Sequence, residues 1–242
     1  MGARASLRES DTPVCRYRRF VPASTLPLEI RNLQVGRIRH DYDVVWALQR
    51  RLHDQVADGS AAPVILLVEH DEVFTAGSRT QPADLPTDGS EVIRVDRGGR
   101  ITWHGPGQLV CYPIVRLAHP YDVMAHVRRL EQIAIQTCAS FGVPAERIPS
   151  RSGVWITGDG VRPAKIAAVG VRVARGVTMH GLALNVDCDL GWSRRIVACG
   201  LPDAGVTSLQ QELDRPVSIT DVLPAFISSL ESVLGAGAGA VR

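Results

Sequence analysis

The chain has 242 residues, a formal net charge of +2 and 45% hydrophobic residues. This length suits one large domain or two small ones with a real core. The charge is too small to argue for nucleic-acid binding, and no apolar run approaches the ~20 residues that a membrane span needs. Five scattered cysteines without a CxxC pair, and no signal peptide, indicate a reducing compartment, so we expect the protein in the cytoplasm.

The two ends of the chain differ in composition from its middle. Residues 1–24 are rich in arginine and are predicted to be a disordered leader. Residues 235–242, in which Gly and Ala alternate up to Ala240, are predicted to be a flexible tail. Residues 25–234 contain no repeat and no long linker. We therefore predict one domain over 25–234.

Hydrophobic periodicity predicts the elements of this domain in chain order. Apolar residues recur at helical spacing over 41–58, where Asp41 or Asp43 caps the start and Gly59 ends the helix. The uninterrupted apolar run 64–68 is typical of a strand buried on both faces. The later predicted elements are strands 92–95 and 109–115, a helix at 122–141 capped by Asp122, a hairpin of 153–157 with 165–174, a strand at 177–186 and a helix at about 220–234 with Ser218 or Thr220 as its cap. Helices interspersed with mainly non-crossover strands favour an α+β fold with a mixed sheet and packed helices.

Four residues carry more specific predictions. Val44 belongs to the apolar face of the first helix, and Trp46 is expected to pack in the core. Pro113 indicates an edge strand or a bulge, because proline cannot donate to a ladder. Cys138 lies on the apolar face of the helix at 122–141 and is expected to be a core residue.

The segment 97–110 combines four glycines, a proline, two arginines, a Trp and a His. Neither a helix nor a plain strand favours this mixture, whereas glycine permits positive φ and close backbone approach. One interpretation is a tight loop between two strands. The other is a ligand-binding loop that binds both the polar head and the apolar body of one ligand.

Lys165 is the single lysine among 27 basic residues, and it lies in an apolar segment. Arginine cannot give up its proton in a protein, but a desolvated lysine amine can. Lys165 is therefore a candidate proton-transfer group. The alternative is a lysine without a functional role, whose side chain extends along apolar surface and places its amine in solvent.

Among the cysteines, Cys199 has the best local chemistry for a nucleophile. It is followed by Gly and Pro, which indicates a loop, and it has no acidic neighbour before Asp203. Cys188 lies between two carboxylates, which are expected to raise the pKa of its thiol. The groups that can activate Cys199 are Lys165 and three histidines at strand or loop ends, His70, His104 and His180. The opposing interpretation is an inert, buried thiol.

The sequence contains no HExxH, no cysteine pair, no acidic cluster with ligand spacing and no GxxxxGK[ST] loop. We therefore expect no metal and no cofactor.

Four ordered blocks resemble the lipoyl(octanoyl) transferases, over about residues 30–215. They are Glu69-His70 with 74–77, the loop 97–109, Lys165–Arg172 with His180–Asn185, and Ala198-Cys199-Gly200. Asp71 stands where the family often carries proline.

The resemblance implies the α+β catalytic domain shared with biotin and lipoate protein ligases. It implies an octanoyl donor on acyl carrier protein, and acceptor lysines in lipoyl domains of 2-oxoacid dehydrogenases and the glycine cleavage H protein. By the same resemblance, Cys199 is the acyl-thioester nucleophile and Lys165 its partner. The substrate-binding residues that it implies are Arg97, Gly98, Gly99, Arg100, Ile101, Thr102, Trp103, His104, Ala168, Val169, Gly170, Gly181, Leu182 and Ala183.

Three alternatives lie outside this interpretation. An ATP-dependent lipoate or biotin ligase would form an acyl-adenylate and need no nucleophilic cysteine. A non-catalytic binding module would tolerate loss of Cys199 and Lys165. A cysteine-dependent hydrolase would release the free acid.

Overall fold

The structure, a computed structural model, describes residues 28–158, 160–196 and 204–235. The predicted leader 1–24 lies outside the described residues, as does the predicted tail after Gly235.

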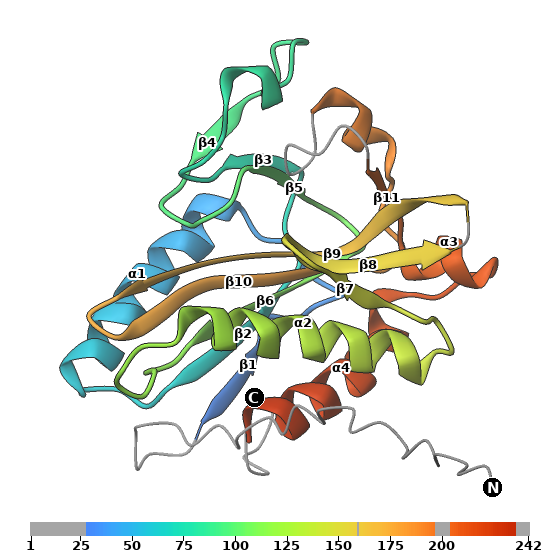
Figure 1. The fold of residues 1–242 in the computed structure, drawn as a ribbon. Helices are drawn as coiled ribbons and strands as arrows, with labels where there is room; N and C mark the ends of the chain where they lie inside the picture. The colour runs from blue at the N-terminus through green and yellow to red at the C-terminus, as the bar shows by residue number, and fades with distance from the viewer. Residues whose placement is uncertain (1–27, 159, 197–203, 236–242) are drawn as a thin grey trace, which may run out of the picture.

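Eleven strands and four α-helices are formed by the described residues (Figure 1). The strands are β1 (Glu29–Asn32), β2 (Val64–Val68), β3 (Val73–Ala76), β4 (Val92–Arg94), β5 (Ile101–His104), β6 (Gln108–Ile114), β7 (Glu146–Ile148), β8 (Arg151–Gly158), β9 (Val161–Ala174), β10 (Val177–Asn185) and β11 (Gly205–Val206). The helices are α1 (Tyr42–Asp58), α2 (Val123–Ser140), α3 (Leu209–Leu213) and α4 (Ile219–Leu234).

The strands form two sheets. The main, eight-stranded sheet has the order β1-β2-β6-β10-β9-β8-β7, with β11 beside β9. Its β1–β2 and β11–β9 pairs are parallel and its other pairs antiparallel. The second sheet has the order β4-β3-β5 and lies at one end of the main sheet (Figure 1). The predicted α+β fold with a mixed sheet is confirmed.

Alternation along the central strands divides the core into two layers. On β2, Ile65 and Leu67 face a cluster that contains α2 and α4, whereas Val64, Leu66 and Val68 face α1. The main sheet is thus covered by helices on both faces (Figure 1). This arrangement explains the uninterrupted apolar run 64–68, because both faces of β2 are buried.

The helix termini agree with the predicted capping residues. The Asp41 side chain accepts hydrogen bonds from the amides of Asp43 and Val44, and Gly59 ends α1 at φ 78°. Asp122 caps α2. Ser218 caps α4 and forms a capping box with Asp221.

The predictions for Val44 and Trp46 are wrong, the edge-strand alternative for Pro113 is wrong, and the prediction for Cys138 is confirmed. Val44 is 64% exposed, because it lies outside the α1 stripe that faces the sheet. Trp46 is only half-buried, with the Arg50 guanidinium 4.3 Å from its ring centroid. Pro113 is not on an edge strand but on β6, paired with β2 on one side; its ladder with β10 stops at Cys111. Cys138 is fully buried in the core, as predicted.

The small sheet was not predicted beyond β4. The strand β5 lies inside the glycine-rich segment interpreted as a loop, and it pairs antiparallel with β3. The short strands β1, β7 and β11 also lack a sequence signal of their own. None of the helices in the described residues is long and apolar enough to cross a membrane.

Candidate active site

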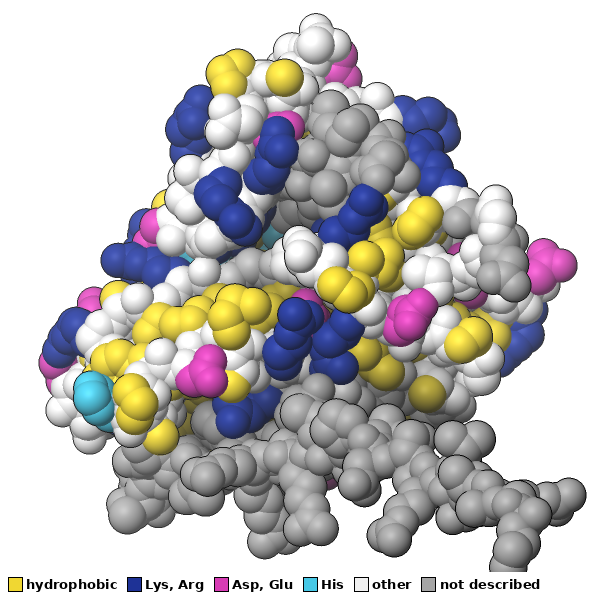
Figure 2. All heavy atoms as spheres, in the orientation of Figure 1, with side chains coloured by type: hydrophobic (Ala, Val, Ile, Leu, Met, Phe, Trp, Pro, Cys, Tyr) yellow, Lys and Arg dark blue, Asp and Glu magenta, His cyan; other side chains and the backbone are white. Residues whose placement is uncertain are grey.

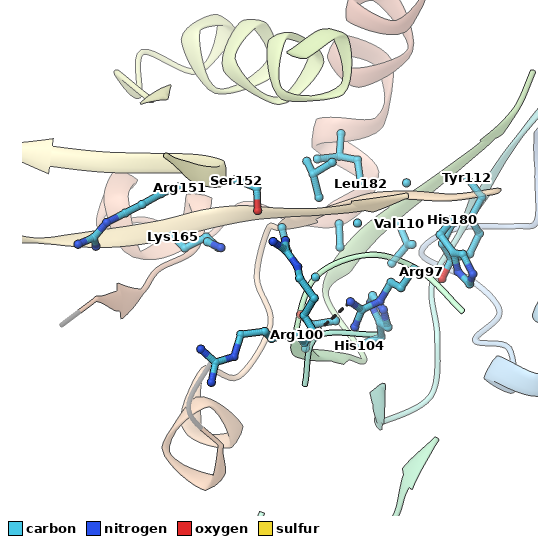
Figure 3. A pocket seen from close by; sticks show the side chains of 18 of the residues that line it. Arg97, Arg100, His104, Val110, Tyr112, Arg151, Ser152, Lys165, His180 and Leu182 are labelled. Atoms are coloured by element: carbon cyan, nitrogen blue, oxygen red, sulfur yellow. Dashed lines mark hydrogen bonds between the residues drawn. The ribbon is translucent and has the colours of Figure 1, made fainter. Parts of the chain in front are cut away.

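A cavity of about 370 Å³ lies between the segments around the small sheet and strands β6, β8, β9 and β10 (Figure 3). Its lining has three parts. One end carries Lys165, Arg151 and Ser152, and the other carries His180 and Tyr112. The surface between them is formed by small and aliphatic residues of the main sheet: Val110, Ala168, Val169, Gly170, Gly181, Leu182 and Ala183.

The lining includes five cationic side chains, and none of the described lining residues is acidic. Two of the five hold the glycine-rich segment in shape. The buried Arg97 guanidinium donates to the carbonyls of Thr75 (2.8 Å) and Arg100 (2.8 Å; Figure 3). Arg100 makes a bidentate ion pair with the buried carboxylate of Asp84, from Nε to Oδ2 at 2.7 Å and from Nη2 to Oδ1 at 2.5 Å. The other three cations are Arg79, Arg151 and Lys165.

Lys165 is 7% exposed and reaches the cavity from β9. Its Nζ lies 4.6 Å from the ring centroid of Trp155, its register partner on β8. The Lys165 carbonyl accepts a hydrogen bond from the amide of Thr207, just after β11. The single lysine of the chain is therefore a buried, backbone-anchored group at the end of the cavity.

A neutral histidine lies behind Tyr112 at the opposite end of the cavity. His70 Nδ1 lies 3.0 Å from the His40 carbonyl, so it carries the proton, and Nε2 accepts from the Tyr112 hydroxyl at 2.9 Å. Burial lowers the pKa of His70 to about 4. At neutral pH, Tyr112 therefore points its hydroxyl proton away from the cavity toward His70.

The tautomer of His104 is set by a chain of hydrogen bonds that ends on a backbone carbonyl. Asn185 Nδ2 donates to the Thr207 carbonyl (2.9 Å), and its oxygen accepts from Gln108 Nε2 (2.8 Å). The Gln108 oxygen therefore faces His104 Nδ1 (2.7 Å), which carries the proton. Burial holds the pKa of His104 well below its usual value, so Nε2 is unprotonated at neutral pH.

His180 has a left-handed backbone, at φ 58°, which is rare for residues other than glycine. Its amide donates to Gln49 of α1, and its Nε2 lies 2.8 Å from the Asp96 carboxylate. Burial lowers the pKa of His180, while the Asp96 hydrogen bond opposes that change. The unusual backbone directs this imidazole to the α1 side of the sheet, where it borders the cavity.

Most of the predicted site residues, the catalytic Lys165 among them, line the cavity. They are Arg97, Gly99, Arg100, Thr102, His104, Lys165, Ala168, Val169, Gly170, Gly181, Leu182 and Ala183. Gly98, Ile101 and Trp103 are absent from the lining. Ile101 and Trp103 alternate with Thr102 and His104 along β5 and pack into the cluster with Phe74 and Trp192; the Trp103 and Trp192 rings stack at 4.5 Å.

The predicted nucleophile Cys199 lies outside the described residues, so its placement relative to Lys165 stays a prediction. The other thiols within the described part of the chain are buried. Burial, and then Asp187 and Asp189, raises the pKa of Cys188 to about 12, which agrees with the predicted direction. Burial raises the pKa of Cys138 to about 12 and also raises that of Cys111. These three thiols are poor nucleophiles at neutral pH.

Several lining residues were not among the predicted site residues: Tyr42, Arg79, Gln81, Val110, Tyr112, Ser150, Arg151, Ser152 and His180. Val110 belongs to the singled-out segment 97–110, and His180 is a histidine at a strand end; the others carried no signal. They come from α1, β6, β8 and the segments that follow β3 and β7, and local patterns do not encode the long-range packing that brings these together.

The comparisons with known proteins agree with this geometry. Residues 41–231 match the family model described as the lipoyl protein ligase A/B catalytic domain, and the chain belongs to that family. An octanoyltransferase of Salinispora arenicola (strain CNS-205) is 54% identical over 214 residues, covering 88% of this chain and 100% of the relative. One of Corynebacterium efficiens is also 54% identical, covering 88% and 84%. Within the family, the chain is a member of the octanoyltransferases, which are acyltransferases.

Solved structures show the same fold at low sequence identity. A bipartite lipoate protein ligase of Thermoplasma acidophilum aligns with a TM-score of 0.66 at 16% identity, covering 87% of this chain and 84% of the other. A lipoate-protein ligase A bound with ATP aligns with a TM-score of 0.63 at 18% identity, covering 86% of each chain. The lipoate ligase fold implied by the resemblance is confirmed.

Proposed function

We propose that this protein transfers an octanoyl group from the thioester of octanoyl-acyl carrier protein to a lysine of a lipoyl domain. The observation that carries the proposal is the position of Lys165. This single lysine of the chain is buried at one end of a cavity whose middle surface is small and aliphatic. The proposal extends to residues 25–234 as one catalytic domain, supported by a main sheet that begins with β1 and packs against α4.

The acyl chain binds along the middle surface. Burial is worth ~0.8 kcal/mol per methylene, so an eight-carbon chain gains about 5 kcal/mol. With its carbonyl near Lys165, the chain runs past Ala168 and Ala183 toward Tyr112 and His180. The small side chains along this path leave room for it.

The chemistry takes two steps without net oxidation or reduction. The Cys199 thiolate attacks the thioester carbonyl, the carbonyl–sulfur bond to the carrier arm breaks, and the carrier thiol leaves with the proton taken from Cys199. The acceptor lysine then attacks the Cys199 thioester, its nitrogen loses a proton, and the Cys199 thiol is restored. Lys165 carries the proton in both steps.

The register of β11 supports the pairing of Cys199 with Lys165. Val206 follows Cys199 by seven positions and is the register partner of Lys165. Seven residues span at most about 25 Å. We therefore propose that Cys199 acts within reach of the strand that carries the amine.

The partners proposed are acidic proteins. Lys and Arg side chains are spread over the upper part of the face in Figure 2. Arg79, Arg162 and Arg194 are among the exposed arginines of the chain. Such a surface suits octanoyl-acyl carrier protein as donor and the lipoyl domains of 2-oxoacid dehydrogenases and the H protein as acceptors, by steering more than by affinity. A reactive thiol needs reducing conditions, which supports the cytoplasm as the location.

The test is incubation with octanoyl-acyl carrier protein in the absence of ATP, followed by intact mass spectrometry and peptide mapping. We expect one octanoyl group on Cys199, lost in Cys199→Ala and retained in the matched variant Cys138→Ala. The absence of an adduct would contradict the proposal.

A second arm of the experiment distinguishes octanoyl transfer from the alternative function, that of an ATP-dependent ligase. That alternative rests on fold likeness to lipoate ligases at 16–18% identity. Free octanoate and ATP should give no octanoyl-adenylate and no lipoyl-domain product. Product formation that requires ATP and survives Cys199→Ala would favour the ligase.

A further inference from the structure

The Lys165 side chain lies in a cradle formed by two residues of the neighbouring strand. On one side is Trp155, 1% exposed, whose ring centroid is 4.6 Å from Lys165 Nζ. A tryptophan face is the strongest aromatic partner for a cation. Trp155 and Lys165 are register partners, so β8–β9 pairing itself brings ring and amine together.

The second residue of the cradle is Gly153. A Cβ at this position would lie 3.2 Å from Lys165 Cε, 3.4 Å from Cδ and 2.5 Å from the Ala167 carbonyl oxygen. Its φ of 100° also disfavours any other residue. Because Gly153 has no side chain, it leaves open the space that the methylene groups of Lys165 occupy.

The cradle is anchored from behind the sheet. The Gly153 amide donates to Glu131 Oε1 at 3.0 Å, and Glu131 is fully buried on α2. Arg128 and Arg147 pair with the other carboxylate oxygen at 2.8 and 3.0 Å. Because one oxygen of Glu131 holds β8 and the other is neutralised, the strand is fixed where it meets the lysine stem.

We propose that Trp155 and Gly153 are positioning residues that hold the Lys165 amine at the end of the cavity. Trp155 is absent from the cavity lining in the described part of the chain, so it acts through Lys165 rather than on the substrate. The Arg151 guanidinium lies 5.8 Å from the same ring and does line the cavity. Both cations at this end of the cavity therefore lie near the same ring, with the amine the nearer of the two. This inference rests on the proposed function for its catalytic meaning, but its geometry is testable alone.

The test uses the fact that the chain has a single lysine. Protein labelled with isotopic lysine gives one ε-methylene resonance in an NMR spectrum. In the wild type we expect this resonance upfield of its position in the urea-unfolded protein, because the amine end lies over the Trp155 ring. The upfield displacement should disappear in Trp155→Leu and persist in part in Trp155→Phe. A wild-type resonance at the unfolded position would overturn the cradle, whatever the enzyme's activity.

The kinetic arm follows octanoyl transfer in the same three proteins, after circular dichroism shows that each is folded. Misplacing a catalytic group costs about 10- to 100-fold in kcat. We expect a loss of this size for Trp155→Leu with the KM for octanoyl-acyl carrier protein changed by no more than about twofold, and recovery in Trp155→Phe. Wild-type kcat in folded Trp155→Leu would overturn the positioning role while leaving the proposed function intact. Failure of the wild type to transfer an octanoyl group would contradict the proposed function. The NMR result would then decide by itself whether Trp155 and Gly153 hold the Lys165 amine.

Discussion

Lys165 and Val206 are register partners in the neighbouring parallel strands β9 and β11. The amide of Thr207 donates to the Lys165 carbonyl at 3.0 Å, so the two strands are joined at the residue that carries the amine. Asn185 donates a hydrogen bond to the Thr207 carbonyl and accepts one from Gln108. The side-chain oxygen of Gln108 in turn accepts from His104 Nδ1. One hydrogen-bonded network thus connects β11 to a histidine of the cavity.

The first prediction concerns the proton carried by Lys165. Lys165→Met removes the group, and we expect transfer to fall by about 10²- to 10⁴-fold. Lys165→Arg keeps the charge but cannot exchange its proton, so it should fall by a similar factor. The rate of the octanoyl-carrier reaction in each variant is the measurement. Near wild-type rates in Lys165→Arg would show that a fixed positive charge is sufficient.

The second prediction concerns the length of the acyl chain. Ala183 lines the cavity and is 3% exposed, so a larger side chain there occupies space that the chain uses. Ala183→Leu should lower kcat/KM for octanoyl more than for hexanoyl donors. Each methylene excluded costs about 0.8 kcal/mol, or about fourfold in relative kcat/KM. An unchanged octanoyl-to-hexanoyl ratio would place the chain elsewhere.

The third prediction concerns close backbone packing at Gly181. A Cβ there would lie within 3 Å of both the Cys111 carbonyl oxygen and Pro113 Cδ, on the adjacent strand β6. Gly181→Ala should therefore lower the free energy of unfolding in urea by about 1–3 kcal/mol. Gly98→Ala is the matched control, because its nearest contact is an ordinary 3.4 Å. Equal stabilities of the two variants would contradict the packing described for β10.

The fourth prediction concerns acid stability. His126 is fully buried on α2, neither ring nitrogen has a hydrogen-bond partner among the described residues, and burial, then Arg129, lowers its pKa to about 4. The unfolded chain binds this proton near pH 6.5, so stability is lost as pH falls from about 6.5 toward 4, by up to about 3 kcal/mol.

His126→Leu removes this titration. Urea unfolding at pH 7 and pH 5 should show a smaller loss on acidification in the variant than in the wild type. His70, His104 and His180, whose pKa values are also lowered by burial, would supply the remaining loss. Identical losses in the two proteins would mean that His126 is accessible to protons in the folded state.

The fifth prediction concerns the exposed arginines. If they steer an acidic donor, added salt should lower kcat/KM for octanoyl-acyl carrier protein, because the Debye length falls from about 10 Å at 0.1 M to about 3 Å at 1 M. A small octanoyl thioester without the carrier is the control and should be far less sensitive. Equal salt dependence of the two donors would count against steering by charge.

The helices were predictable because their signals are local. The Asp41 and Ser218 caps and the Gly59 stop each act within one helical turn. The strand β2 was predictable because burial on both faces leaves an uninterrupted apolar run. Val44 was misjudged because adjacent positions of α1 diverge in direction, and only Val45 faces the sheet.

The site was less predictable because it is assembled by pairing between distant strands. Arg97 and Thr102 were recognised from the glycine-rich segment, but the alternation along β5 that turns Trp103 away from the cavity required the pairing with β3. Arg151 and Tyr112 carry no local signal and reach the cavity only through the order of the main sheet.

The most direct test of the central claim is a chase of the isolated acyl-enzyme. The protein is loaded with octanoyl-acyl carrier protein, freed of the donor, and mixed with an unmodified lipoyl domain in the absence of ATP. The account predicts that the octanoyl group leaves Cys199 and arrives on one lysine of the lipoyl domain in equal amount. Release as free octanoate, or an acyl-enzyme that the lipoyl domain does not discharge, would contradict it.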